Sequence, residues 1–339
     1  MEIAALWALI GILANAHAGT LDTCRLPIVS PAYGDQPSMH WCFEISVTLN
    51  SAAVGRLLSE HIFKSQAEGN NQFKASTRKD PRNNFDTISG QEDDDLLRVV
   101  QGDYSNHTAF RESVPGHDRL FMVTHFYGPF DVKQLKIEYA KIAYAAGVKQ
   151  IVDISATAVG FGWRTSYLAT MSRELEETIL AIPNRGTYVA LRPGRFVSNN
   201  IIYDKPGIVS SNAIFEPIGR DDLEEWISPN DIGTLAAIVL QEPIEKHGNA
   251  AYEIVGDYVT PKQRAAYFSA ALGREITFKQ VSYAEKYKKI AGHLPHLFAY
   301  ELAAGYRKIN IDPGVLSILL GRQPETLEQW IHANKDALL

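Results

Sequence analysis

Residues 119–155 read RLFMVTHFYGPFDVKQLKIEYAKIAYAAGVKQIVDIS, and this stretch decides the fold class. Residues 119–124 and 150–155 are short and largely apolar, which predicts two strands. Between them, residues 132–146 have the spacing of a helix, and Gly147 follows at a position where glycine commonly ends one. A strand, a helix and a strand in this order predict a βαβ unit with parallel strands.

The same alternation extends in both directions along the chain. Further strands are predicted at residues 44–49, 73–77, 97–101 and 187–192, and further helices at residues 54–65 and 173–181. We therefore expect an α/β fold, a Rossmann-like doubly wound parallel sheet with helices on both faces.

The regular alternation of strands and helices ends in the last part of the chain. Helices are expected to begin after Ser228 and after Thr260, and residues 282–339 are mostly helical by pattern. We expect a sheet domain over residues 43–200 and a smaller, mostly helical substrate-binding lobe over residues 201–339. This lobe is expected to close over the carboxyl edge of the sheet.

Residues 1–42 are predicted to be an appendage to these two domains. Residues 3–14 are apolar but shorter than the roughly 20 residues that cross a bilayer as a helix, so no membrane span is expected. Residues 16–18, AHA, resemble a signal-peptidase site, although no Lys or Arg precedes them. Residues 1–18 are therefore a signal peptide, a buried helix or an extension from the gene model, and residues 19–42, with several turn formers, are a tether. The protein is expected in the cytoplasm, or in the secretory pathway if the signal is functional.

The composition is that of a packed globular protein. Of 339 residues, 45% are hydrophobic and 21% are charged, which excludes a disordered or collagen-like chain. Lys and Arg number 33 against 39 Asp and Glu, a net charge of −6, so no nucleic-acid partner is expected. The 10 histidines are dispersed and the 2 cysteines lie within the appendage, so no metal site is expected.

Short motifs follow one another along the chain in a characteristic order. They are VTLNSAAVGR at residues 47–56, STRKDP at 76–81, VQGD at 100–103, LRPGRF at 191–196 and ISPNDIG at 227–233. Together they resemble the NmrA-like, isoflavone-reductase-like branch of the atypical short-chain dehydrogenases. The segments LGR at 272–274 and GRQP at 321–324 are similar to those of fungal secondary-metabolism members of the festuclavine-dehydrogenase type. The resemblance implies that the sheet domain binds NAD(P).

The first motif occupies the place of the family's phosphate-binding loop, whose glycines let the backbone approach the pyrophosphate at a helix N-terminus. Gly55 keeps the last of three glycines, whereas Leu49 and Ala52 replace the others, and a leucine resists the tight turn of the first position. Two interpretations stay open: the loop binds the dinucleotide through Ser51 and backbone amides, or it has lost this function. The resemblance assigns four residues of this loop to the cofactor: Thr48, Ser51, Val54 and Gly55.

Arg78 and Lys79 fall at the end of the second predicted strand. A cation there pairs with the 2′-phosphate of NADP, whereas an acidic residue would bind the ribose hydroxyls of NAD. The resemblance therefore implies NADP(H) as the cofactor, and the alternative is a solvated basic turn. The family places Asp103 near the adenine, and the alternative is an aspartate that caps a helix or a turn. Thr124 and Arg173 are further expected to bind the cofactor.

Three residues are candidates for catalysis. Short-chain dehydrogenases often pair a tyrosine with a lysine four residues later, but Tyr167 is followed at that spacing by Met171. Tyr167 remains a candidate acid, and the alternative is a packed aromatic side chain in the substrate loop. Ser155 closes a strand near the place where a nicotinamide would lie. His125 is a candidate proton donor because histidine titrates near neutrality, and its alternative is a cleft-lining residue without a catalytic function.

Aromatic side chains are dense in residues 126–130 and 161–167, which favours an aromatic or polycyclic small-molecule substrate. The alternative is that these side chains belong to the core. We expect an NAD(P)H-dependent oxidoreductase, monomeric or homodimeric, that reduces a C=C, C=N or C=O bond of a secondary metabolite. One alternative is a non-catalytic NmrA-like regulator that senses a dinucleotide. Another is a cofactor-free isomerase or cyclase on the same scaffold, suggested by Leu49 and Ala52 in the loop.

Overall fold

The computed structural model describes residues 24–30, 40–47, 97–102, 106–123, 131–162, 164–292, 294–304 and 310–339. Within them, a 7-stranded sheet has the order β3-β2-β1-β4-β5-β6-β9. Its strands are β1 Cys24–Ser30, β2 His40–Val47, β3 Leu97–Gly102, β4 Arg119–Met122, β5 Gln150–Ile154, β6 Thr187–Pro193 and β9 Ala251–Ile254. Strands β1, β4, β5, β6 and β9 run parallel, whereas β2 is antiparallel to both of its neighbours.

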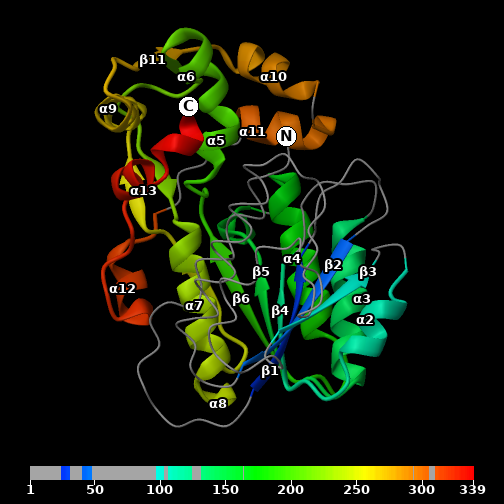
Figure 1. The fold of residues 1–339 in the computed structure, drawn as a ribbon. Helices are drawn as coiled ribbons and strands as arrows, with labels where there is room; N and C mark the ends of the chain where they lie inside the picture. Colours follow the sequence, from blue (N-terminus) through cyan, green and yellow to red (C-terminus); the bar gives the residue numbers. More distant parts are fainter. Residues whose placement is uncertain are drawn as a thin grey trace, which may run out of the picture.

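Helices cover both faces of this sheet (Figure 1). Met122 and Ile151 pack on one face with α2, α3 and α4, and the alternate residues Phe121 and Val152 pack on the other with α7 and α12. This alternation follows from the two-residue period of a strand and confirms the doubly wound α/β fold. The helices are α2 Thr108–Ser113, α3 Val132–Ala145, α4 Tyr167–Leu180, α7 Pro229–Gln241 and α12 Gly314–Leu320.

The predicted division at residue 200 is corrected by the structure, because β9, α7 and α12 lie after it and belong to the sheet and its covering helices. The rest of residues 201–339, called the C-terminal lobe below, contains two small sheets besides its helices, which the sequence analysis missed. Strand β7 (Ala213–Glu216) pairs in parallel with β11 (Thr277–Gln280), and β8 (Glu224–Trp226) pairs antiparallel with β10 (Asp257–Val259). Their strands are 3 or 4 residues long, too short for a clear alternating pattern. The remaining helices are α5 Asn199–Tyr203, α6 Lys205–Ser211, α8 Ile244–His247, α9 Pro261–Leu272, α10 Tyr283–Ala291, α11 His296–Ala304 and α13 Leu327–Ala333, with 3-10 helices at Thr157–Gly160 and Lys335–Leu338.

Most predicted boundaries in the described ranges agree with the structure to within two residues. Ser228 and Thr260 cap α7 and α9, as predicted from their positions before a proline. Two elements differ by more: β2 begins at His40, four residues before the predicted start at residue 44, and α4 begins at Tyr167, six residues before the predicted start at residue 173. The Ser166 side chain accepts a hydrogen bond from the Ala169 N–H (3.0 Å) and so starts the helix earlier than its apolar spacing indicated.

The tether predicted over residues 19–42 is corrected by the structure. Strand β1 lies inside the sheet, where it pairs with β2 on one side and with β4 on the other. All of β1 pairs with β2, and Ile28 and Val29 also pair with β4. This pairing stabilises the strand through segments that lie elsewhere in the sequence, which a local pattern does not reveal. No helix in the described ranges is long and apolar enough to cross a membrane.

Candidate functional site

The carboxyl end of β5 carries the first of the expected site residues. Ser155 follows the strand directly, and its N–H donates to the Leu191 carbonyl of β6 at 2.7 Å. The chain then passes through the 3-10 helix Thr157–Gly160 and enters α4. Doubly wound sheets bind ligands outside the carboxyl ends of their strands, so β5 brings Ser155 to the edge where a ligand is expected.

The Ser155 side chain is part of a buried hydrogen-bonded chain. Its hydroxyl donates to Glu176 Oε1 at 2.5 Å, and Ser155 and Glu176 are only 3% and 5% exposed. Arg192 donates from Nε to Glu176 Oε1 (3.0 Å) and from Nη2 to Oε2 (2.5 Å). The hydrogen bond to Glu176 raises the pKa of Arg192, so the guanidinium stays charged. This arrangement fixes the Ser155 rotamer and compensates the buried carboxylate with a bidentate cation.

Arg173 lies three residues before Glu176 on α4, and it binds the loop that follows β5. Its Nη2 donates to the Val159 carbonyl at 2.6 Å and to the Phe161 carbonyl. This contact orders the turn between β5 and α4 and engages one end of the guanidinium. Binding of a cofactor by Arg173 stays a prediction.

Tyr167 is the first residue of α4 and belongs to a different group of contacts. The residue is 42% exposed, and its ring meets the Phe298 ring of α11 edge to face, with centroids 5.4 Å apart. Its backbone N–H donates to Glu301 of α11 at 2.8 Å. Ser155 therefore begins the loop that Arg173 binds, whereas Tyr167 contacts α11 in the C-terminal lobe.

Several expected site residues lie outside the described residues, and their roles stay predictions. They are Thr48, Ser51, Val54, Gly55, Arg78, Lys79, Asp103, Thr124 and His125.

A second buried polar cluster lies within the sheet domain. The Lys136 ammonium of α3 contacts Asp153 Oδ1 and the Ile154 carbonyl, both at 2.7 Å, and the Tyr188 hydroxyl donates to Asp153 Oδ2 at 2.8 Å. Burial raises the pKa of Asp153, and the lysine opposes that effect. The cluster anchors the end of β5, at Asp153 and Ile154 just before Ser155, to α3 and β6.

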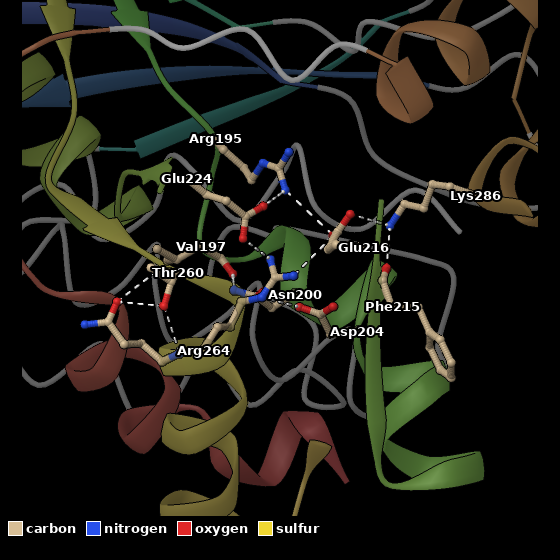
Figure 2. A network of polar contacts seen from close by, with 11 residues as sticks. Arg195, Val197, Asn200, Asp204, Phe215, Glu216, Glu224, Thr260, Arg264 and Lys286 are labelled. Atoms are coloured by element: carbon tan, nitrogen blue, oxygen red, sulfur yellow. Dashed lines mark hydrogen bonds and ion pairs between the residues drawn. The ribbon is translucent and has the colours of Figure 1, made fainter. Parts of the chain in front are cut away.

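The C-terminal lobe contains a third cluster, a network of charged side chains that no sequence motif predicted (Figure 2). Arg264 of α9, only 1% exposed, lies 3.6 Å from Asp204, 3.2 Å from Glu216 and 3.3 Å from Glu224. Arg195, which follows β6, reaches Glu224 at 2.9 Å. Lys286 lies 3.1 Å from Glu216, so the network contains three carboxylates and three cations. Together they join the end of β6 to the lobe.

The charges of this network differ in how well they are compensated. Burial raises the pKa of Asp204 to about 6, because neither carboxylate oxygen has a hydrogen-bond partner among the described residues. Burial also acts to raise the pKa of Glu216, but Lys286, Arg264 and Arg195 outweigh it and hold that pKa at about 2. Asp204 is thus the weakly compensated member of the network.

Sequence reasoning missed two carboxylates that organise the candidate site. Glu176 lies in an expected helix, but its role depends on Ser155 and Arg192, 21 and 16 residues away in sequence. Glu301 lies 134 residues from Tyr167 and had no local signal. Within the described part of the chain, no group of three or more His, Cys, Asp or Glu residues is arranged to hold a metal ion.

Comparison with known proteins extends this picture. A model of the NmrA-like family matches residues 53–330. A curated relative, the (4-alkanoyl-5-oxo-2,5-dihydrofuran-3-yl)methyl phosphate reductase of Streptomyces griseus, is 27% identical over 248 residues, covering 71% of this chain and 84% of the relative.

Two solved structures have a similar fold. One is an NADPH-dependent quinone oxidoreductase from Escherichia coli in complex with NADPH, with 23% identity and a TM-score of 0.58, covering 68% of this chain and 81% of that one. The other is the negative transcriptional regulator NmrA in complex with NAD, with 16% identity and a TM-score of 0.50, covering 68% and 78%. At these identities the two structures support the fold alone.

Proposed function

The chain belongs to the NmrA-like family, and we propose that it is an NAD(P)H-dependent oxidoreductase. We further propose that it prefers NADPH and reduces a C=C, C=N or C=O bond of a secondary metabolite. The observation that carries the proposal is the similarity to a reductase along 84% of that relative's length. A match over 248 residues extends far beyond a shared nucleotide-binding motif.

The described end of β5 is compatible with this chemistry. Ser155 presents a hydroxyl whose proton is committed to Glu176, which leaves its oxygen lone pairs as acceptors for a polar ligand group. Arg192 and Glu176 keep this hydroxyl in one orientation. Such preorganisation favours a ligand that needs a fixed acceptor, as the amide of a nicotinamide does.

A bound NADPH would supply the hydride, and the protein would supply orientation and a proton. We assign the phosphates to the loop at residues 48–55 and the 2′-phosphate to Arg78 and Lys79. Tyr167 is the proposed donor of the proton that completes the reduction, because it stands at the start of α4 and is 42% exposed. Reduction of an iminium or quinone-like acceptor would depend less on proton donation by Tyr167.

The first test is titration of NADPH and NADH into the full-length chain, followed by nucleotide fluorescence. We expect NADPH to bind more tightly than NADH, and Arg78→Ala to weaken NADPH binding while leaving NADH binding unchanged. Turnover is then followed as loss of NADPH absorbance with quinone, iminium and unsaturated lactone acceptors. Absence of binding by either nucleotide would mean that Leu49 and Ala52 close the phosphate loop, and would reject an oxidoreductase.

A dinucleotide-sensing regulator is the second candidate. The residue four positions after Tyr167 is Met171, so the usual proton-relay lysine is missing. Tight nucleotide binding without reduction of any acceptor in the panel would favour this function over the reductase.

A further inference from the structure

The first turn of α4 is held by a side chain of the C-terminal lobe. The Glu301 carboxylate accepts hydrogen bonds from the N–H groups of Tyr167 (2.8 Å) and Leu168 (3.1 Å) and from the Ser166 hydroxyl. The first N–H groups of a helix have no partner within the helix, so Glu301 satisfies two of them. The bonds join residues more than 130 positions apart and therefore link the lobe to the sheet domain.

A second contact joins the same two helices. The Tyr167 ring packs edge to face on Phe298, which is itself 8% exposed. Phe298 and Glu301 are three residues apart and lie on one face of α11. Both the backbone and the ring of Tyr167 are thus placed by α11.

We propose that Glu301 is a positioning residue for the reduction, because it sets the place of Tyr167 at the carboxyl edge of the sheet. This inference rests on the proposed function. A carboxylate at the positive end of a helix forms charge-assisted hydrogen bonds and holds that turn more strongly than a neutral side chain. Any shift of α11 on substrate binding is transmitted through Glu301 and Phe298 to Tyr167, so the lobe and the proton donor move together.

The test uses the full-length protein and the variants Glu301→Ala, Glu301→Gln and Tyr167→Phe. Glu301→Ala is expected to lower kcat by about 10- to 100-fold with KM for NADPH unchanged, since a misplaced reacting group costs up to about 100-fold. Glu301→Gln retains one accepting oxygen and is expected to restore part of kcat. Glu275→Gln is the control, because Glu275 is exposed and belongs to the same lobe.

Two further readouts separate positioning from general stability. Amide hydrogen exchange of residues 167 and 168 is expected to quicken in Glu301→Ala and to stay unchanged in Glu275→Gln. In a Tyr167→Phe background, Glu301→Ala is expected to cause little additional loss of kcat, because its effect acts through the missing phenol.

Each outcome has a distinct meaning. If the wild-type chain binds no NADPH and reduces no acceptor, the proposed function is rejected and this inference with it. If the wild-type chain turns over and Glu301→Ala has the same kcat, only the inference is rejected. A variant that merely unfolds at a lower temperature, with normal kcat below that temperature, rejects it as well.

Discussion

Arg192 of β6 binds Glu176 of α4 through two hydrogen bonds, Nε to Oε1 at 3.0 Å and Nη2 to Oε2 at 2.5 Å. The same carboxylate accepts the Ser155 hydroxyl, so one ion pair orients the residue at the end of β5. The bidentate geometry requires a planar guanidinium, which a lysine does not provide. The pair therefore matters both to the packing of α4 on the sheet and to the candidate site.

Arg192→Met is expected to destabilise the protein by about 2–3 kcal/mol, because it leaves the Glu176 carboxylate buried without its cation. This value is at the low end for a buried pair, since the Arg192 side chain is 20% exposed. Urea unfolding measures the loss. Arg220→Met, at a 61% exposed side chain, is the matched control and should leave stability unchanged. Equal stability of Arg192→Met and the wild type would contradict the role given to this pair.

Tyr167→Phe is expected to separate chemistry from packing. The phenylalanine ring keeps the contact with Phe298, and the backbone bond to Glu301 is unaffected. Thermal stability should therefore stay the same, while kcat falls by about 100-fold or more if Tyr167 is the proton donor. Steady-state kinetics with one acceptor checks this, and an unchanged kcat would remove Tyr167 from the mechanism.

Lys136→Met is expected to destabilise the fold by about 3–5 kcal/mol, because both Lys136 and Asp153 are fully buried and Asp153 would lose its cation. The double variant with Asp153→Asn should recover part of this loss, since no buried charge is left unpaired. Denaturant unfolding of the two singles and the double gives the coupling energy. Additive effects would show that the two side chains do not stabilise one another.

Asp204→Asn is expected to change how stability depends on pH. The pKa of Asp204 is about 6 in the folded protein against an ordinary value of 3.8. At pH values well below 3.8 the group is neutral in both states. Between about pH 4 and 6 it ionises in the unfolded chain but stays neutral in the folded protein, so rising pH opposes folding. The wild type should thus lose about 2 kcal/mol from this group between pH 4 and 7, by about 1.4 kcal/mol per pKa unit.

The asparagine variant lacks this ionisation, so its stability relative to the wild type should rise over the same pH range. Urea unfolding from pH 4 to 7.5 measures the difference. Asp221→Asn is the control, since the Asp221 side chain is 75% exposed. If the difference in the free energy of unfolding between Asp204→Asn and the wild type does not change with pH, burial does not raise the pKa of Asp204, and the prediction is wrong.

The central strands and α3 were predictable because their signals are local. Residues 150–155 and 187–192 are short apolar runs, and they form β5 and β6 within one residue of the predicted ends. The start of α4 was missed because it depends on one capping serine and not on apolar spacing. Strand β1 was missed because its partners, β2 and β4, lie elsewhere in the sequence.

The sequence alone determined the fold class, the family resemblance and the candidate residues Ser155, Tyr167 and Arg173, since period and motif order are properties of neighbouring residues. Only the tertiary structure decided that Ser155 meets the Glu176 carboxylate, that Tyr167 meets the Glu301 carboxylate and that Arg173 meets two backbone carbonyls. Glu176 lies 21 residues from Ser155 and Glu301 lies 134 residues from Tyr167. Contacts over such separations depend on how helices pack on the sheet, and packing is set by the whole core and not by any local stretch.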